Sequence, residues 1–447
     1  MTDSNFESWG RFPKVAHAGV LTPGGFGEVE SAMRSITSTL LPRGLGRSYG
    51  DSCLNEEGYL LWTKWLNKLH AFDPQTGVLR CDAGVSLEEI LRVFVPQGWF
   101  LPVSPGTKFV TVGGAIANDI HGKNHHRAGS FGNHVRRFEL LRSDGERMLC
   151  SPSSNADWFQ ATIGGLGLTG VILWAEFALK PIYGPYLALE SIKLESLEEF
   201  FTLSRESDLG YEYTVAWLDC LSGGNKMGRG LLLRANHTSD PEHDVAKILP
   251  KDAAWKTFPM DAPSFLLSAH ALKAFNWMYY HKQLTKSRKH RIHFDQYFYP
   301  LDSIHHWNRM YGKRGFLQWQ CVVPTAANHQ ALRMILEKIT RSRLGSFLAV
   351  LKEFGNIAPL GMLSFPMPGV TLALDFAYAD SKLLPLLDEL DEIVTGHGGR
   401  IYPAKDARMA QKTFRSAFPA FEHFKRYIDP KLSSSFYRRV DVAHGQA

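Results

Sequence analysis

Two glycine-rich stretches contain the residues whose types and spacing point most directly to a ligand. The first spans residues 43–51 and reads RGLGRSYGD, and the second spans residues 105–134 and includes VGGAIANDIHG at 112–122. Glycines at this density let the backbone approach a ligand closely and turn its N–H groups inward. Such a backbone can bind a pyrophosphate without one side-chain cation for each oxygen. Because no single helix dominates either stretch, we expect a cradle made of loops.

Three histidines have a spacing that could be mistaken for a metal site. They are His121, His125 and His126, in the pattern HxxxHH. Gly122 disfavours a helix that would place His121 and His125 on one face, and no cluster of further ligands accompanies them. We therefore expect no metal here.

Two glutamines and a further glycine motif complete the candidate chemistry. Gln318 and Gln320 lie two residues apart in an expected strand, so their amides share one face and could bind sugar hydroxyl groups, although each alone could be an ordinary exposed residue. Residues 165–170 match GxGxxG, the pattern of a Rossmann dinucleotide site. That site needs a helix after the glycines, whereas a strand is expected at 171–179. We therefore reject a Rossmann site and expect a tightly packed turn.

The composition is that of an ordinary globular protein with more than one domain. A chain of 447 residues, 44% hydrophobic and 21% charged, is expected to form two or three domains. The net charge of +6 is spread along the chain, which argues against nucleic-acid binding and suits an anionic cofactor, an anionic substrate or an acidic membrane surface. Five widely spaced cysteines without a CxxC pattern indicate neither a disulfide framework nor a zinc site.

The cysteines and the hydropathy pattern together favour a cytoplasmic location. Unpaired cysteines fit a reducing compartment. Residues 1–13 are polar and carry acids, unlike a signal peptide. No run approaches the ~18 uncharged apolar residues of a membrane span.

The elements that must position these motifs differ between the two parts of the chain. Residues 38–185 read as short strands with few helices, including strands at 59–62, 78–81 and 170–179 and a hairpin over 138–150. Ser86 and Glu89 form a capping box that begins a helix, which Gly98 ends.

After Pro181 the pattern changes to strands that alternate with longer helices. We expect strands at 316–323, 347–354 and 370–378, and helices near 326–339 and 383–394. This order favours an α+β domain built on an antiparallel sheet.

Basic and aromatic residues interleave over residues 270–293. One interpretation is a solvated surface segment, and the other is a patch that docks on anionic lipid headgroups. The residues concerned are His270, Lys273, Trp277, Tyr279, Tyr280, Lys282, Lys286, Arg288, Lys289 and Arg291.

Taken together, the glycine-rich stretches resemble the FAD-binding loops of flavoenzymes of the vanillyl-alcohol-oxidase type. Within that group the chain closely resembles the decaprenylphosphoryl-β-D-ribose 2-oxidase family. The resemblance continues through AGSFGNH at 128–134, GGLGLTG at 164–170, GFLQWQ at 315–320 and YPAKD at 402–406. It covers nearly the whole chain, except residues 1–20 and about 225–290.

The resemblance implies an α+β fold with two domains. A two-lobed FAD-binding domain of the vanillyl-alcohol-oxidase type would occupy residues 1–185, and residues 400–447 would return to it. The substrate-binding domain would occupy residues 186–399 and contain the antiparallel sheet.

The cofactor implied is non-covalent FAD. In covalent members of the wider superfamily a histidine of the first loop attaches to the flavin, whereas this chain has Arg47, which cannot form that bond but could pair with a phosphate. Tyr49 and Tyr402 would pack on the flavin ring edges or simply in the core. The implied cofactor-binding residues are Arg43, Gly44, Leu45, Gly46, Arg47, Ser48, Tyr49, Gly50, Asp51, Gly106, Thr111, Val112, Gly113, Gly114, Asn118, Asp119, Ile120, His121, Ile172 and Tyr402.

The resemblance places two catalytic residues beside the flavin. His121 would accept the substrate hydroxyl proton, unless it is only a hydrogen-bonded structural residue of its loop. A lysine is usually a surface residue, but Lys405 matches an active-site lysine whose charge could stabilise a reduced flavin or a developing alkoxide.

The implied substrate-binding residues lie in the second domain. They are Gln318, Gln320, Lys352 and Thr371, and Lys352 could meet a phosphate. Some family members carry a cysteine where this chain has Ala373, and an asparagine is common where it has Thr371. Contacts to the substrate are therefore expected to differ, whereas His121 and Lys405 are intact.

The activity implied is FAD-dependent oxidation of the 2′-hydroxyl of a polyprenylphosphoryl-β-D-ribofuranose to the 2′-keto sugar. A separate NAD(P)H reductase of the short-chain dehydrogenase class would complete the epimerisation to the arabinose form used for arabinan in the cell envelope. The lipid substrate implies peripheral contact with the inner face of the plasma membrane.

Other functions remain open at this point. They are a soluble sugar, alditol or aldonolactone oxidase on the same fold, a flavin-holding structural subunit of a glycan-assembly complex and, more weakly, a peptidoglycan-type reductase on a related fold.

Overall fold

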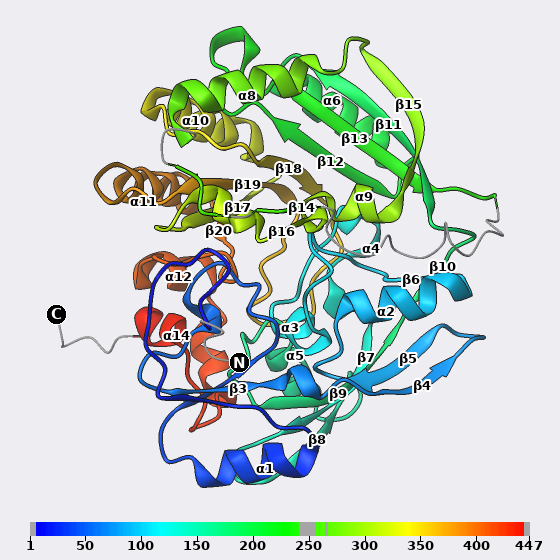
Figure 1. Cartoon of the computed structure of the whole chain (residues 1–447), viewed down its shortest axis with the longest axis vertical. Coiled ribbons are helices and arrows are strands. Elements are labelled where there is room, and N and C mark those ends of the chain that lie inside the picture. Colours follow the sequence, from blue (N-terminus) through cyan, green and yellow to red (C-terminus); the bar gives the residue numbers. More distant parts are fainter. Residues whose placement is uncertain (1–5, 241–255, 259, 264–266, 442–447) are drawn as a thin grey trace.

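The computed structural model describes residues 6–240, 256–258, 260–263 and 267–441, and these form two parts that stack one above the other (Figure 1). The lower part in Figure 1 contains the chain from its N-terminal residues through β9 (Val171–Ala178) and its C-terminal helices. The upper part contains the central residues, built around one large sheet. None of the helices within the described ranges is long and apolar enough to cross a membrane.

The two larger sheets of the lower part have three and five strands. A three-stranded parallel sheet has the order β1 (Gly19–Leu21), β3 (Tyr59–Trp62), β2 (Leu40–Arg43). A five-stranded antiparallel sheet has the order β4 (Leu69–Asp73), β5 (Val78–Asp82), β9 (Val171–Ala178), β7 (Val135–Leu141), β8 (Arg147–Cys150). The strands and the hairpin predicted for this part are confirmed.

The predicted capping box is also confirmed. Helix α2 (Leu87–Phe94) begins after Ser86, whose hydroxyl accepts from the Glu89 N–H while the Glu89 carboxylate accepts from the Ser86 N–H. A short 3₁₀ turn then ends at Gly98, whose φ of 81° is the left-handed conformation that favours glycine. The side chains Leu87, Ile90, Leu91 and Phe94 are buried, as their helical spacing predicts.

The upper part is an eight-stranded antiparallel sheet, and this confirms the sheet type predicted for the second domain. Its order is β15 (Ser287–His293), β11 (Tyr186–Leu194), β13 (Gly230–His237), β12 (Tyr213–Leu218), β18 (Ala349–Phe354), β19 (Gly369–Ala377), β17 (Phe316–Pro324), β20 (Arg400–Ile401). The longer helices of this part are α6 (Leu197–Ser207), α8 (Ala269–His281), α10 (Asn328–Ser342) and α11 (Asp380–Gly396).

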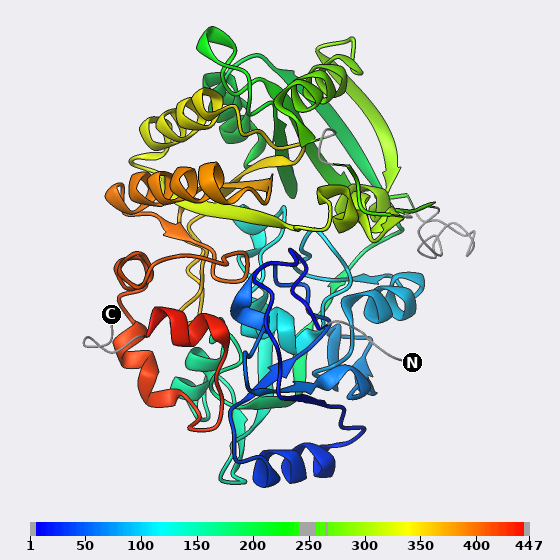
Figure 2. The ribbon, with the colours of Figure 1, turned by 60° about the vertical axis from the view of Figure 1, so that its left-hand side comes forward.

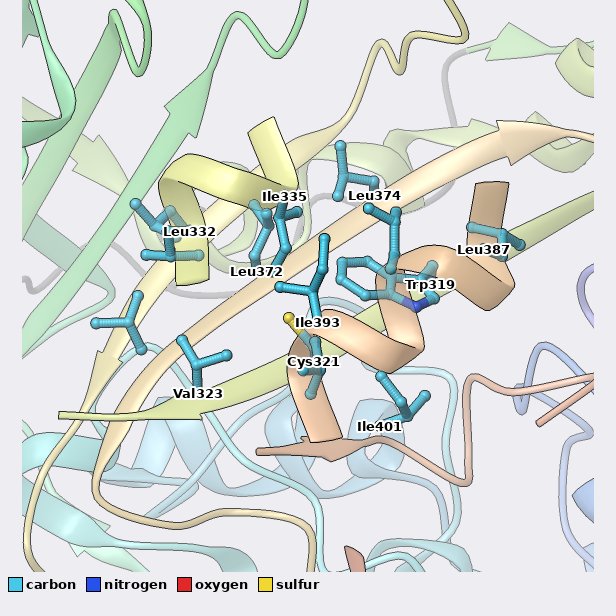
Figure 3. Close-up of a cluster of buried hydrophobic side chains, with 14 of the residues drawn as sticks. Trp319, Cys321, Val323, Leu332, Ile335, Leu372, Leu374, Leu387, Ile393 and Ile401 are labelled. Atoms are coloured by element: carbon cyan, nitrogen blue, oxygen red, sulfur yellow. The ribbon is translucent and has the colours of Figure 1, made fainter. Parts of the chain in front are cut away.

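Side chains alternate between the two faces of β17 and β19. Figure 3 shows Trp319, Cys321 and Val323 of β17 and Leu372 and Leu374 of β19 packed against α10 and α11. Because successive strand residues point to opposite faces, Gln318 and Gln320 of β17 and residues 371, 373 and 375 of β19 face away from those helices. The apolar half of the pattern thus anchors the sheet and turns the polar half toward the lower part.

The C-terminal tail packs against the lower part. Arg439 of α14 (Ser435–Val440) makes ion pairs with the buried carboxylates of Asp51 and Asp406, 2.7 Å and 2.8 Å away. Figures 1 and 2 both show these C-terminal helices beside the N-terminal loops. These contacts support our proposal that residues 1–185 and 400–447 form one domain and residues 186–399 another, although β20 itself pairs with β17 of the large sheet.

Shorter elements complete the two parts. The remaining helices are α1 (Phe26–Ser35), α3 (Val112–Ala117), α4 (His125–Ala128), α5 (Ala156–Thr162), α9 (Phe294–Phe298), α12 (Gln411–Ala417) and α13 (Phe421–Phe424), and the remaining strands are β6 (Trp99–Phe100), β10 (Lys180–Pro181), β14 (Lys256–Thr257) and β16 (Ile304–His305).

Candidate active site

A cavity of about 400 Å³ lies between the glycine-rich loops of the lower part and the polar face of β17, β18 and β19. Its volume is typical of a site for a small molecule or cofactor. Most of the predicted site residues line it, namely Arg43, Gly44, Leu45, Gly46, Arg47, Ser48, Tyr49, Gly106, Thr111, Gly113, Gly114, Asn118, Ile120, His121, Ile172, Gln318, Gln320, Lys352, Tyr402 and Lys405. Residues separated by up to 362 positions are therefore brought to one place.

The first glycine-rich loop leaves backbone donors free at the cavity. Among the described residues, no acceptor is present for the N–H groups of residues 45–48. A run of free N–H groups in a loop is a site for an anion. Gly46 has a φ of 63°, and an added Cβ there would lie 2.1 Å from the Arg43 guanidinium, so the loop requires glycine at this position.

The Arg43 guanidinium holds the loop rather than facing a ligand. It donates to the carbonyl groups of Phe6, Glu7 and Cys53 at 2.7–2.9 Å. Arg47 differs, because its guanidinium stacks on the Trp9 ring at 4.0 Å and its buried Nε has no hydrogen-bond partner in the described part of the chain. Arg47 is therefore the arginine of this loop that is available to a ligand.

The second glycine-rich stretch contains a short helix, which corrects the expectation that loops alone form the cradle. Helix α3 begins after Thr111, whose Oγ1 accepts from the Gly114 N–H at 3.1 Å. An added Cβ on Gly44 would lie 2.2 Å from this same Oγ1, so the two stretches pack directly on each other. The helix forms because Thr111 caps it and residues 115–117 are apolar, a signal that the glycines obscured.

Five predicted residues do not line the cavity: Gly50, Asp51, Val112, Asp119 and Thr371. Asp119 lies behind the wall and accepts from the hydroxyls of Ser130 and Ser364 and from the Gly132 N–H. Asp51 pairs with Arg439, and Thr371 is fully buried beside Gln320. These residues hold the wall in place.

His121, on the loop after α3, contacts the polar face of the large sheet. Its Nε2 is 2.9 Å from the Gln320 amide nitrogen and its Nδ1 is 3.2 Å from Lys352 Nζ. The rings of Phe354 and Tyr402 pack on it at 4.8 Å and 5.6 Å. Gly122 lies outside α4, so His121 and His125 do not share a helix face.

Two proton arrangements satisfy both neighbours of the His121 ring. If Lys352 is charged, it donates to Nδ1, and Nε2–H then donates to the Gln320 carbonyl oxygen, which requires the amide to be rotated by half a turn. If Lys352 is neutral, it accepts from Nδ1–H and the Gln320 amide donates to Nε2. The orientation of Gln320 is therefore linked to the tautomer of His121.

Burial and like charges keep the imidazole neutral. Burial, followed by the charges of Lys352, His125 and Lys405, lowers the pKa of His121 well below its usual 6.5. Burial lowers the pKa of Lys352 to about 8. A neutral ring offers a lone pair that can accept a proton.

Lys405 occupies the side of the cavity next to Tyr49. Its Nζ lies 3.8 Å from the centre of the Tyr49 ring, a cation–π contact. Burial lowers the pKa of Lys405 to about 7, against the opposing effect of the Asp375 carboxylate. The lysine therefore changes its charge near neutral pH.

Sequence reasoning missed two acidic residues at this site. Asp302 lines the cavity, where it accepts from the Lys108 N–H at 2.9 Å and from the Thr107 hydroxyl at 3.1 Å. Asp375 lies on β19 in register with Gln318. The alternation of β19 was a usable signal for Asp375, because residues 371 and 375 share a face. No local pattern marks Asp302, because it lies in a 3₁₀ turn.

Comparisons with known proteins agree with this geometry. A family model described as an FAD binding domain matches residues 17–151. The chain is 37% identical to a decaprenylphosphoryl-β-D-ribose oxidase of Mycolicibacterium smegmatis, over 99% of this chain and 98% of that protein. It is 32% identical to an uncharacterized protein of Streptomyces coelicolor, over 80% of this chain and 100% of that protein. A Delta(24)-sterol reductase of Mus musculus is 33% identical over 30% of this chain and 26% of its own length.

The cavity fits the FAD that these matches indicate. The free N–H groups of residues 45–48 suit a pyrophosphate, and the unpartnered Arg47 Nε adds a cationic donor. Gly106 lines the cavity, and an added Cβ there would meet no atom within 4 Å, so the space beside it is open for a ligand.

Replacing Gly106 by leucine tests this fit. The side chain would enter open space without disturbing the protein, so we expect the fold to persist while FAD affinity falls at least about tenfold, since the branched side chain blocks part of the site. The measurement is flavin content after purification and titration of the apoprotein with FAD. Gly27→Leu is the matched control, because that glycine lies on α1 and also has no atom within 4 Å of an added Cβ. Equal FAD affinity in the two variants would contradict the assignment.

Proposed function

The chain belongs to the decaprenylphosphoryl-β-D-ribose oxidase family, and we propose that this FAD-dependent oxidoreductase oxidises the 2′-hydroxyl of a polyprenylphosphoryl-β-D-ribofuranose to the 2′-keto sugar. The observation that carries the proposal is the polar cluster of the cavity. There a neutral imidazole, two lysines and two amides face the space that the glycine-rich loops close from below. The reaction would be the first half of an epimerisation, completed by a separate NAD(P)H reductase of the short-chain dehydrogenase class.

FAD, when bound, supplies the acceptor for the hydride that leaves the carbon of the alcohol. The residues of this chain bind the two partners, orient them and handle the hydroxyl proton. His121 is assigned the role of proton acceptor, because its ring is neutral and is fixed from both sides by Gln320 and Lys352.

Substrate binding would release one of these contacts. Lys352 is partly exposed in the cavity and can turn from the imidazole to the substrate phosphate, with which an ammonium group interacts strongly. The Nδ1 lone pair of His121 is then free for the sugar hydroxyl. Burial of His121 makes it a weak base, so the reaction also needs a nearby positive charge that stabilises the developing alkoxide.

Lys405 provides that charge. Its Nζ has no hydrogen-bond acceptor among the described residues, so its protons are available to a ligand in the cavity. A preorganised cation in a cavity shielded from water stabilises a developing negative charge more than it would in water.

The remaining substrate contacts fit a sugar. Gln318 and Gln320 line the cavity, and Thr371 accepts from Gln320 at 3.1 Å, so it acts on the substrate through that amide. Ala373 also lines the cavity and leaves space on the face between Thr371 and Asp375.

A comparison of substrates tests the proposal against the alternative of a soluble sugar or aldonolactone oxidase. The enzyme is given a polyprenylphosphoryl ribose, free ribose, an alditol and an aldonolactone, and kcat/KM is measured for each. We expect the lipid-linked sugar to exceed the others by at least about 10³-fold, since it alone engages the phosphate and lipid contacts. A free sugar or lactone that is oxidised equally well would support the alternative.

Removing the Lys405 charge should slow the chemical step. We expect Lys405→Met to lower the rate of flavin reduction by about 10²–10³-fold with FAD content unchanged, because one preorganised electrostatic contact is lost. Rapid mixing under anaerobic conditions measures the rate. Lys412→Met is the matched control, because Lys412 is an exposed lysine of α12. Unchanged flavin reduction in Lys405→Met would favour a flavin-holding structural subunit instead.

The pH dependence of flavin reduction follows from the same charges. Lys405 is cationic below its pKa of about 7, so the rate should fall as the pH rises through about 7. His121 has a pKa well below 6.5, so protonation of the imidazole should reduce the rate only in distinctly acidic solution. A rate that rises between pH 6 and 8 would contradict these assignments.

Contact with a membrane is the further part of the proposal. The segment of α8 and β15 contains no acidic residue between Asp261 and Asp295. It exposes Trp277, Met278 and Leu284, whose exposed fractions are 58%, 59% and 91%. Figure 1 shows α8 and β15 at the upper end of the molecule, away from the C-terminal tail. Exposed apolar side chains among cations suit the inner face of a membrane with anionic lipids.

A charge reversal tests the membrane contact. We expect the wild type to float with phosphatidylglycerol vesicles at low salt, and Lys273→Glu with Lys282→Glu and Lys289→Glu to lose most of that binding, because each basic residue contributes about 1 kcal/mol near such a surface. The control triple, Lys68→Glu with Lys226→Glu and Lys412→Glu, changes the net charge equally at exposed lysines elsewhere. Equal loss of vesicle binding in both triple variants would show that net charge, not this segment, causes the binding. If the wild type does not float, the segment is better described as a solvated surface.

A further inference from the structure

Asp375 is a buried carboxylate at the active site that the mechanism above does not use. It is 1% exposed and lies on the cavity side of β19, opposite Gln318 of β17. Burial raises the pKa of its carboxyl group to about 7, so keeping a charge there is costly. A buried carboxylate of this kind is expected to be held by hydrogen bonds and by nearby positive charge.

The hydrogen bonds of Asp375 fix the orientation of Gln318. The Gln318 amide nitrogen donates to Oδ1 of Asp375, the Tyr311 hydroxyl lies 3.4 Å from Oδ2, and the Asp375 N–H donates to the Ser346 hydroxyl at 3.0 Å. A carboxylate can only accept, so it selects one of the two amide rotamers. The Gln318 carbonyl oxygen is therefore directed away from Asp375, where it can accept from a sugar hydroxyl.

The carboxylate also acts on Lys405. Asp375 is the acidic group whose charge favours the ammonium form of Lys405, and the Lys352 charge opposes it. No direct hydrogen bond joins Lys405 to Asp375, so the ammonium group stays against the Tyr49 ring and open to the cavity. The neighbouring phenol of Tyr49 is buried, and its pKa is raised well above 10 by burial and then by Asp375, so it stays neutral.

We propose that Asp375 is a positioning residue that orients the Gln318 amide as an acceptor for the sugar and that, through its charge, favours the cationic form of Lys405. Its two oxygens accept different hydrogen bonds: Oδ1 accepts from the Gln318 amide and Oδ2 accepts from the Tyr311 hydroxyl. The inference rests on the proposed function for the identity of the substrate only, because the state of Lys405 is measurable without substrate.

The charged groups around the pair are few. The charges of Asp375 on β19 and Lys352 on β18 act on Lys405, whose ammonium group lies against the Tyr49 ring. The charge of Lys405 in turn lowers the pKa of His121. Tyr311 packs next to Tyr49 through Phe316, whose ring stacks on Tyr311 at 4.3 Å. Among these groups Asp375 carries the negative charge, so its removal should lower the pKa of Lys405.

The test is the titration of individual lysines by competitive labelling with acetic anhydride, read by mass spectrometry in the FAD-loaded protein without substrate. In Asp375→Asn, which keeps an acceptor for Gln318 but removes the charge, we expect the midpoint for Lys405 to move to lower pH by one unit or more. The midpoint for Lys352 is expected to move much less, because burial is what lowers its pKa and Asp375 is not among the charges that act on it. Asp375→Glu restores a carboxylate and should bring the Lys405 midpoint back toward the wild-type value.

Two further variants keep the test decisive. Asp391→Asn makes the same change at another buried carboxylate, which binds Trp319 and Arg408 on the other side of the sheet, and should leave Lys405 unchanged. Tyr311→Phe removes a donor to Asp375 and should move the Lys405 midpoint in the same direction by less, even if Asp375→Asn does not fold. An unchanged Lys405 midpoint in every folded variant, or equal shifts of Lys405 and Lys352, would overturn the proposal.

A second reading links Asp375 to the substrate. In Asp375→Asn the fall in the rate of flavin reduction should begin at lower pH than in the wild type, by the same shift that labelling measures. If polyprenylphosphoryl ribose is not oxidised at all, the proposed function is wrong. The labelling experiment, which uses no substrate, still tests the effect of Asp375 on Lys405. If it is oxidised with an unshifted pH profile although Lys405 has shifted, the positioning role in catalysis is overturned.

Discussion

The alternation of side chains along β17 and β19 is the constraint on which the rest of the structure depends. One face of this antiparallel pair is apolar and packs on α10 and α11 (Figure 3). The other face carries Gln318, Gln320, Thr371 and Asp375. Slippage of either strand by one residue would exchange these faces, burying the amides among leucines and removing them from the cavity. The same packing that stabilises the sheet therefore fixes the polar cluster.

The lower part meets this polar face with backbone rather than with side-chain charge. Free N–H groups of residues 45–48 offer donors to an anionic cofactor, and the open side of Gly106 leaves space for it. Positive side-chain charge comes from Lys352 on the sheet and from Lys405 next to Tyr49, with Asp375 as the counter-charge of Lys405. Burial lowers the pKa values of both lysines and of His121, so the site combines a neutral base with cations whose charge is sensitive to pH near neutrality. Such a division suits proton removal from an alcohol beside a cofactor that accepts hydride.

The sequence predicted the parts of the structure that follow from local chemistry. The capping box of α2, the hairpin of β7 and β8 and the helices α10 and α11 depend on neighbouring residues, and all are present. The sequence motifs also predicted most of the residues that line the cavity, because each of these residues lies in a motif that matches the resembled family. Helix α3 was missed because glycines at 113 and 114 weaken the helical signal, although the Thr111 cap overcomes it. Arg43 and Asp51, both predicted to bind the cofactor, make side-chain contacts that the sequence does not show. Arg43 donates to the carbonyl groups of Phe6, Glu7 and Cys53, and Asp51 pairs with Arg439. Such long-range pairs leave no pattern in a single sequence.

Isotopic substitution in the substrate tests the central claim most directly, because it identifies the carbon–hydrogen bond that breaks. The protein is mixed anaerobically with polyprenylphosphoryl ribose carrying deuterium at C2′ or, separately, at C3′, and the bleaching of the oxidised flavin is followed. Our account predicts that deuterium at C2′ slows bleaching several-fold and that deuterium at C3′ has almost no effect. Bleaching that is slowed only by deuterium at another position, or an absence of bleaching with this substrate, would contradict it.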